Sequence, residues 1–274
     1  MLIAGLLVLL LGLSLGAGYQ VLARRARPAQ SYRGPSPLLG LAVWIVAVQL
    51  GGLLLLISGL AEAVEALSFL AVGTLQTILY VGVVWLFVVR SGALGWRDML
   101  GGSAHGGRRR ALLDALVGAG VMVPAAFGAL LLAILVALLL DTQAPAVVPV
   151  PQTSSDVLLV ALGAVLVFPI GEEIFFRGYS LTAWARDIGP RPALVRSALF
   201  FAAVHIANVR SDTFEGGLRQ ALLLLAVIIP VGAVLGWLMV RRGLVAAVAG
   251  HITYNGILIL LLVLGLTLAR SPSG

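Results

Sequence analysis

The chain has 274 residues, of which 61% are hydrophobic and 11% are charged, and its mean hydropathy is +1.10. Soluble domains carry about 25% charged residues, so this composition excludes a soluble globular protein and indicates an integral membrane protein. The formal net charge is +7. All basic side chains are arginines that lie between apolar segments, so we expect membrane lipid as a partner and no nucleic acid. The absence of cysteine excludes disulfides, thiolate metal sites and cysteine nucleophiles.

Apolar segments long enough to cross about 30 Å of hydrocarbon need roughly 20 helical residues each. Eight such segments occur in chain order: about 2–22, 37–60, 67–89, 111–140, 156–176, 193–209, 218–240 and 243–268. The fourth contains Pro124, which predicts a kink or an interfacial start, and the sixth is short. We therefore predict an all-α polytopic membrane protein with about eight transmembrane helices, forming a single membrane domain over residues 1–274.

The distribution of arginines predicts the orientation of these helices. The N-terminal segment has no basic residue before its apolar core, unlike a secretory signal, so we expect a retained helix that begins outside the cytoplasm. With this orientation Arg210, Arg219 and Arg270 lie outside, and the other 15 of the 18 arginines lie inside, in agreement with the positive-inside rule. Both termini are then predicted outside the cytoplasm, in what we expect to be a prokaryotic cell membrane.

The proline-rich stretch APAVVPVPQTSSD, residues 144–156, divides the chain into two halves, and the C-terminal half contains the candidate chemistry. Polar side chains inside a membrane span are costly, so each is a candidate for function. These candidates are Glu172, Glu173 and Arg177 on the fifth segment, His205 and Asn208 on the sixth, and His251 and Asn255 on the eighth.

The depths of these side chains can be estimated from arginines that mark the inner surface. His205 follows Arg196 by nine residues and His251 follows Arg242 by nine, so each imidazole lies about 13 Å below that surface. Glu172 lies five residues before Arg177 and fourteen before Arg186, so a helix that continues past Arg177 would place Glu172 at a similar level. Three helices are therefore predicted to converge on one point.

Spacing within each helix predicts different roles for the side chains. Glu173 and Arg177 are four residues apart, the favourable order for an ion pair, so we assign them to structure. Glu172 points about 100° away and is the better general base. His251 and Asn255 present an imidazole and an amide on one face, which can bind water and stabilise an oxyanion. Phe201 lies one turn before His205 as an apolar wall.

Each polar residue also has a structural interpretation. A single histidine or asparagine in a membrane helix is often a hydrogen-bonding contact between helices, but an adjacent glutamate pair with two histidines at matched depth favours a site. His105, in the loop GGSAHGGRRR, is predicted to be a solvated loop residue. The arginine run after it is predicted to be a cytoplasmic anchor near acidic lipid.

Three motifs occur in order on three apolar segments: EEIFFR, FAAVH and HITYN. They resemble the EExxxR, FxxxH and HxxxN motifs of the CAAX-prenyl-protease and bacteriocin-processing family of intramembrane proteases, also called the CAAX amino-terminal protease or ABI family. The resemblance covers about residues 157–262. The helices of residues 1–143 carry no motif, but they are compatible with the eight-helix core of such proteins.

The resemblance implies hydrolysis of a peptide bond inside the membrane. By similarity, Glu172 with His205 would activate the attacking water, and His251 with Asn255 would stabilise the tetrahedral oxyanion. The predicted ion pair would hold the site together. The substrate would be a membrane-associated protein or peptide, and the sequence leaves open whether it is prenylated.

Metal dependence also stays open at this point. Family members have been described both as metalloproteases and as glutamate-dependent enzymes that need no metal. Glu172, His205 and His251 would form an acceptable three-ligand set for a divalent metal such as zinc. If Glu172 bound a metal, however, it would not also serve as a free base.

Two functions of other classes remain as alternatives. An intramembrane carboxylate with histidines also suits a proton relay, so a proton-coupled transporter is the first alternative, although no inverted repeat is visible. The second is a catalytically silent membrane scaffold or a bacteriocin-immunity protein on the same fold.

Overall fold

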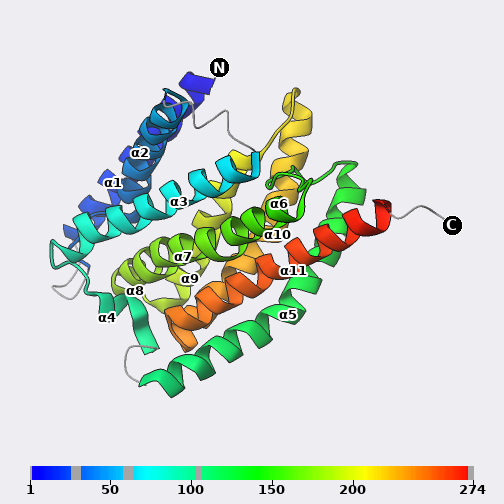
Figure 1. Ribbon diagram of the computed structural model, residues 1–274. Coiled ribbons are helices and arrows are strands. Elements are labelled where there is room, and N and C mark those ends of the chain that lie inside the picture. Colours follow the sequence, from blue (N-terminus) through cyan, green and yellow to red (C-terminus); the bar gives the residue numbers. More distant parts are fainter. Residues whose placement is uncertain (1, 26–31, 58–64, 103–106, 271–274) are drawn as a thin grey trace.

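The computed structural model describes residues 2–25, 32–57, 65–102 and 107–270, and no strand occurs among them. The helices are α1 (Leu2–Arg25), α2 (Pro37–Ile57), α3 (Glu65–Val84), η2 (Trp85–Val89), α4 (Trp96–Leu100), α5 (Gly107–Leu140), α6 (Ser154–Ala161), η4 (Leu162–Val167), α7 (Phe168–Glu173), η5 (Ile174–Leu181), α8 (Thr182–Ile188), α9 (Pro190–His205), η6 (Ile206–Asn208), α10 (Phe214–Arg241) and α11 (Leu244–Arg270). Figure 1 shows their arrangement. His105 and the extreme ends of the chain lie outside the described residues.

Six helices of the described residues are long and apolar enough to cross a membrane. They span Pro37–Leu54, Glu65–Val89, Gly107–Leu140, Ser154–Ile188, Phe214–Arg241 and Leu244–Ala269. The prediction of an all-α polytopic membrane protein is therefore confirmed.

The predicted number of eight spans is approximate, because six helices of the described residues have the length and hydropathy of a membrane span. α1 covers the first predicted segment with 24 residues. The sixth segment forms α9, whose 16 residues extend about 24 Å, less than the hydrocarbon thickness.

One predicted segment bends, as its proline predicts, and another is longer than expected. α5 runs unbroken for 34 residues with Pro124 inside it, and Figure 1 shows that the helix changes direction along its length. A proline inside a helix removes one backbone hydrogen bond, which accounts for a bend without a break. The fifth segment was expected to end near residue 176, but its helical path continues to Ile188, where Gly189 turns the chain with a φ of 82°.

Close helix packing joins the last helix to α5. α11 lies along α5, and the two run side by side in Figure 1. Gly118 of α5 faces the backbone of Ala246 so closely that a Cβ there would collide with the Ala246 carbonyl oxygen. Without a hydrophobic driving force between helices in lipid, small residues allow such contact and let dispersion hold the pair together. This packing fixes the helix that carries His251.

An aromatic core lies beside the candidate residues. Trp44 and Tyr80 stack with ring centroids 4.2 Å apart, and Tyr80 contacts Phe175 and Phe176. Phe176 in turn packs edge-on against Phe201 at 5.2 Å. Aromatic pairs of this geometry add to the free energy gained from burial, so this cluster is a rigid support for the residues at its edge.

Candidate active site

The two glutamates lie on a short α-helical segment between two π-helical segments. α7 ends at Glu173, with η4 before it and η5 after it. π-helices are rare and are frequent at functional sites, because the wider turn changes the direction of the side chains that follow.

Side chains of neighbouring residues satisfy several carbonyls of the two π segments. Thr77 donates to the carbonyl of Val167 at 2.9 Å, and Ser180 donates to that of Phe175 at 2.9 Å. Ser197 of α9 donates to the carbonyl of a third π-segment residue, Phe176, at 3.2 Å. These hydroxyls offset the poorer backbone hydrogen bonding of the irregular turns, and hold the glutamate pair in place.

Glu173 is fully buried and accepts hydrogen bonds from two residues. Arg177 donates to its Oε1 from Nη1 at 2.8 Å, so the ion pair expected from the four-residue spacing is present. His251 Nδ1 lies 2.8 Å from the same oxygen. Arg177 also donates from Nη2 to the carbonyl of Gly232 at 3.3 Å, and its guanidinium lies 4.0 Å from the centre of the Phe201 ring. The pair therefore links α7, α10 and α11.

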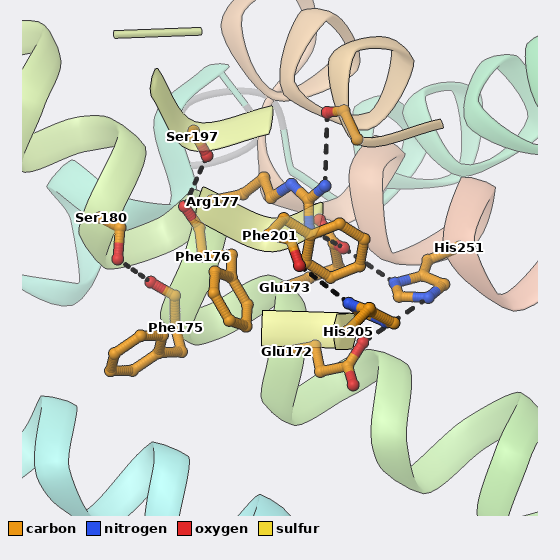
Figure 2. A network of polar contacts seen from close by, with 11 residues as sticks. Glu172, Glu173, Phe175, Phe176, Arg177, Ser180, Ser197, Phe201, His205 and His251 are labelled. Carbon is orange, nitrogen blue, oxygen red and sulfur yellow. Dashed lines mark hydrogen bonds and ion pairs between the residues drawn. The ribbon is translucent and has the colours of Figure 1, made fainter. Parts of the chain in front are cut away.

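His251 lies between the two carboxylates, and the dashed lines of Figure 2 run from its ring to both. A carboxylate paired with arginine only accepts hydrogen bonds, so the Nδ1 atom facing Glu173 carries the hydrogen. The opposite atom, Nε2, is 3.8 Å from Glu172 Oε2. The side chain of Glu172 is 19% exposed, compared with 0% for Glu173. Of the two glutamates, Glu172 is thus the more accessible.

His205 is the last residue of α9, and its tautomer also follows from its hydrogen bond. Nδ1 lies 2.8 Å from the backbone oxygen of Phe201. A carbonyl only accepts, so Nδ1 donates and Nε2 keeps its lone pair. The rings of Phe201 and His205 are 4.4 Å apart, and those of Phe201 and His251 are 5.8 Å apart. The Phe201 side chain therefore contacts both imidazoles.

Asn255 lies one turn after His251 on α11 and donates from Nδ2 to the carbonyl of Ala164 in η4 at 2.7 Å. An amide nitrogen has two hydrogens, so this contact leaves one for another acceptor. Asn208, by contrast, lies in η6, and no hydrogen bond joins its side chain to the glutamates or histidines within the described part of the chain.

Glu172, His205 and His251, the ligands expected if the site holds a metal, are not gathered into one group in this structure. No three His, Asp or Glu side chains among the described residues are placed to hold a metal ion. Glu172 and His251 approach each other, but His205 is not grouped with them as a third ligand.

The contact between Glu173 and His251 is the main feature of the site that sequence reasoning missed. The two residues are 78 positions apart, and the spacing argument gave Glu173 a partner in its own helix only. The capping of π-segment carbonyls by Thr77 and Ser197 was missed too, because the sequence carries no periodic signal for a π-helix.

Comparison with known proteins supports the motif assignment. Residues 154–257 match the family model described as Type II CAAX prenyl endopeptidase Rce1-like, and this segment contains all three motifs. No curated protein and no solved structure matches the chain. This segment is therefore similar to a protease family, and the resemblance stated from the motifs is confirmed for this segment.

Proposed function

We propose that the Rce1-like segment is an intramembrane endopeptidase, which hydrolyses a peptide bond of a membrane-associated protein or peptide with an activated water. The observation that carries the proposal is the continuous contact from Arg177 through Glu173 to His251, with Glu172 beyond it. A buried ion pair orients the histidine, and the histidine faces a carboxylate that is partly exposed. This is the arrangement of an oriented acid–base site.

Glu172 is assigned as the general base. Because Glu172 Oε2 and His251 Nε2 are 3.8 Å apart, a single water beside the pair can lie about 2.8 Å from both atoms. The carboxylate would take the proton of that water as its oxygen attacks the peptide carbonyl, and would then give the proton to the departing amine. His205, with the lone pair of Nε2 free, is assigned as the second group that orients the water.

His251 and Asn255 are assigned to the tetrahedral oxyanion. Asn255 has one amide hydrogen left beside its bond to Ala164, and an amide donor of this kind typically contributes about 10² to 10³ in rate. His251 would donate from Nε2 when both of its ring nitrogens carry a hydrogen. These donors would act where little water penetrates, which strengthens their interaction with the developing charge.

The substrate class follows from the position of the site. Glu172 and His251 belong to helices that are long and apolar enough to cross the bilayer, so the scissile bond must be presented within or against the membrane. The family description names a prenyl endopeptidase, and a prenyl group would hold a peptide at the membrane. Comparing otherwise identical peptides with and without that group decides this point.

The test uses the full chain in lipid nanodiscs with fluorogenic peptides, one prenylated and one anchored by an unrelated acyl chain. Glu172→Gln keeps the size and hydrogen bonding of the side chain but removes the base, so hydrolysis should fall by about 10² to 10⁴. Glu65→Gln makes the same change on an exposed glutamate of α3 and should leave the rate unchanged. Near wild-type cleavage by the Glu172→Gln protein would refute the mechanism.

A wild-type protein that cleaves neither peptide, yet carries protons across vesicles in a Glu172-dependent way, would favour the transporter. A wild-type protein with neither activity would favour the silent scaffold.

A further inference from the structure

Five arginines gather where α5 begins, α10 ends and α11 begins. This group, called the arginine corner below, consists of Arg108, Arg109, Arg110, Arg241 and Arg242. Its two parts are joined through one buried carboxylate: Asp114 lies 3.1 Å from Arg110 Nε and 3.8 Å from Arg242 Nη1, and its side chain is 0% exposed. Five positive charges against one negative leave a formal net charge of +4.

Three members of the arginine corner have no acidic partner. Arg108, Arg109 and Arg241 are exposed and form no ion pair with any residue that the structure describes. The corner is also close to the segment after α4, since a Cβ at Gly102 would lie 2.8 Å from the backbone oxygen of Arg242. That segment brings no acidic side chain to the corner among its described residues. The excess positive charge of the arginine corner therefore favours binding of an anion from outside the chain.

The side chains below these arginines are apolar and exposed. Leu112 and Leu116 follow Arg108 by four and eight residues, so all three lie on one face of α5. The two leucines are 62% and 60% exposed. At 1.5 Å per residue they lie about 6 Å and 12 Å from the arginine along the helix. One face of α5 thus offers a cation followed by an apolar strip.

The end of α10 also places an exposed apolar side chain one turn from an arginine. Trp237 is 43% exposed and precedes Arg241 by one helical turn. Exposed tryptophan is typical of the depth at which lipid headgroups meet the hydrocarbon. The tryptophan therefore indicates that the arginine corner lies at headgroup level rather than in bulk water.

From this we infer that the arginine corner binds an anionic phospholipid of the surrounding leaflet, with its phosphate at Arg108 and Arg109 and an acyl chain along Leu112 and Leu116. A free phosphate would use the arginines alone, whereas a phospholipid matches both the cations and the apolar strip below them. The proposal is independent of the peptidase activity.

The test is a lipid titration of delipidated full-length protein, followed by native mass spectrometry. Phosphatidylglycerol should bind more tightly than phosphatidylcholine with the same acyl chains. Each arginine near an anionic headgroup contributes about fivefold in affinity, so Arg108→Gln with Arg109→Gln should weaken phosphatidylglycerol binding about 30-fold and leave phosphatidylcholine unchanged. Both substituted side chains are exposed and unpaired, so the thermal midpoint of the variant should equal that of the wild type.

The matched control removes the same charge from two exposed arginines elsewhere, by Arg90→Gln with Arg191→Gln, and should keep phosphatidylglycerol affinity within about twofold. Equal losses in the two double variants would mean that net charge alone attracts the lipid, and would overturn the proposal. So would equal affinity for the two lipids. Full competition by millimolar inorganic phosphate would identify a free-anion site instead.

Discussion

Replacing Arg177 by methionine would leave the Glu173 carboxylate buried, with His251 as its remaining hydrogen-bond donor. Both members of the ion pair are 0% exposed, so neither salt nor water screens the lost interaction. Removing one partner of such a pair typically costs about 3–5 kcal/mol. The ratio of folded to unfolded protein should therefore fall on the order of 10² to 10⁴.

The measurement is equilibrium unfolding of the full chain in mixed micelles with increasing dodecyl sulfate, followed by tryptophan fluorescence. A second variant separates stability from chemistry. Glu173→Gln combined with Arg177→Met removes both charges, so most of the stability should return. Hydrolysis should stay low, because the carboxylate that orients His251 is gone. An Arg177→Met protein that unfolds at the wild-type concentration would refute the energetic argument. A double variant with restored hydrolysis would show that Glu173 does not serve His251.

Three further predictions concern the surroundings of the site and its orientation. Gly171→Ala should destabilise the protein by about 1–3 kcal/mol and reduce hydrolysis, because the new Cβ would lie 2.9 Å from the Thr77 Cα. The control Gly82→Ala places its Cβ in open space and should be neutral or slightly stabilising in the same unfolding assay. Asn255→Ala should lower turnover by about 10² to 10³ with little change in KM. It should also lower the free energy of unfolding by about 1–3 kcal/mol, because the Ala164 carbonyl in η4 loses its side-chain donor. Unchanged turnover would exclude Asn255 from the oxyanion site. A topology reporter fused after the last residue should read outside and one inserted in residues 103–106 should read cytoplasmic, and the same side for both would contradict the predicted orientation.

Part of this architecture is a local consequence of the sequence. Hydropathy alone identifies membrane helices, because the bilayer requires about 20 apolar residues with all backbone hydrogen bonds formed inside the segment. The spacing of Glu173 and Arg177 predicts their ion pair, since side chains four apart share a helix face whatever surrounds the helix. The three motifs likewise identify the protease-family segment from residue identity and order. Each of these inferences depends on neighbours along the chain.

Other features depend on residues that meet only after folding. Glu173 takes a second partner, His251, from a helix 78 residues away, and this changes a structural glutamate into one that also orients an imidazole. Asn255 likewise donates one amide hydrogen to the carbonyl of Ala164, 91 residues away, and its own helix does not predict this hydrogen bond.

The π segments around α7 show the same limit. Two of their carbonyls accept hydrogen bonds from the hydroxyls of Thr77 and Ser197, which belong to α3 and α9. Periodicity sets which face of a helix a side chain occupies, but the partner on that face is set by how the helices pack. Hence the sequence by itself determined the membrane fold class, the motif residues and the local ion pair. The tertiary structure decided which glutamate side chain is the more accessible and which histidine lies between the two carboxylates.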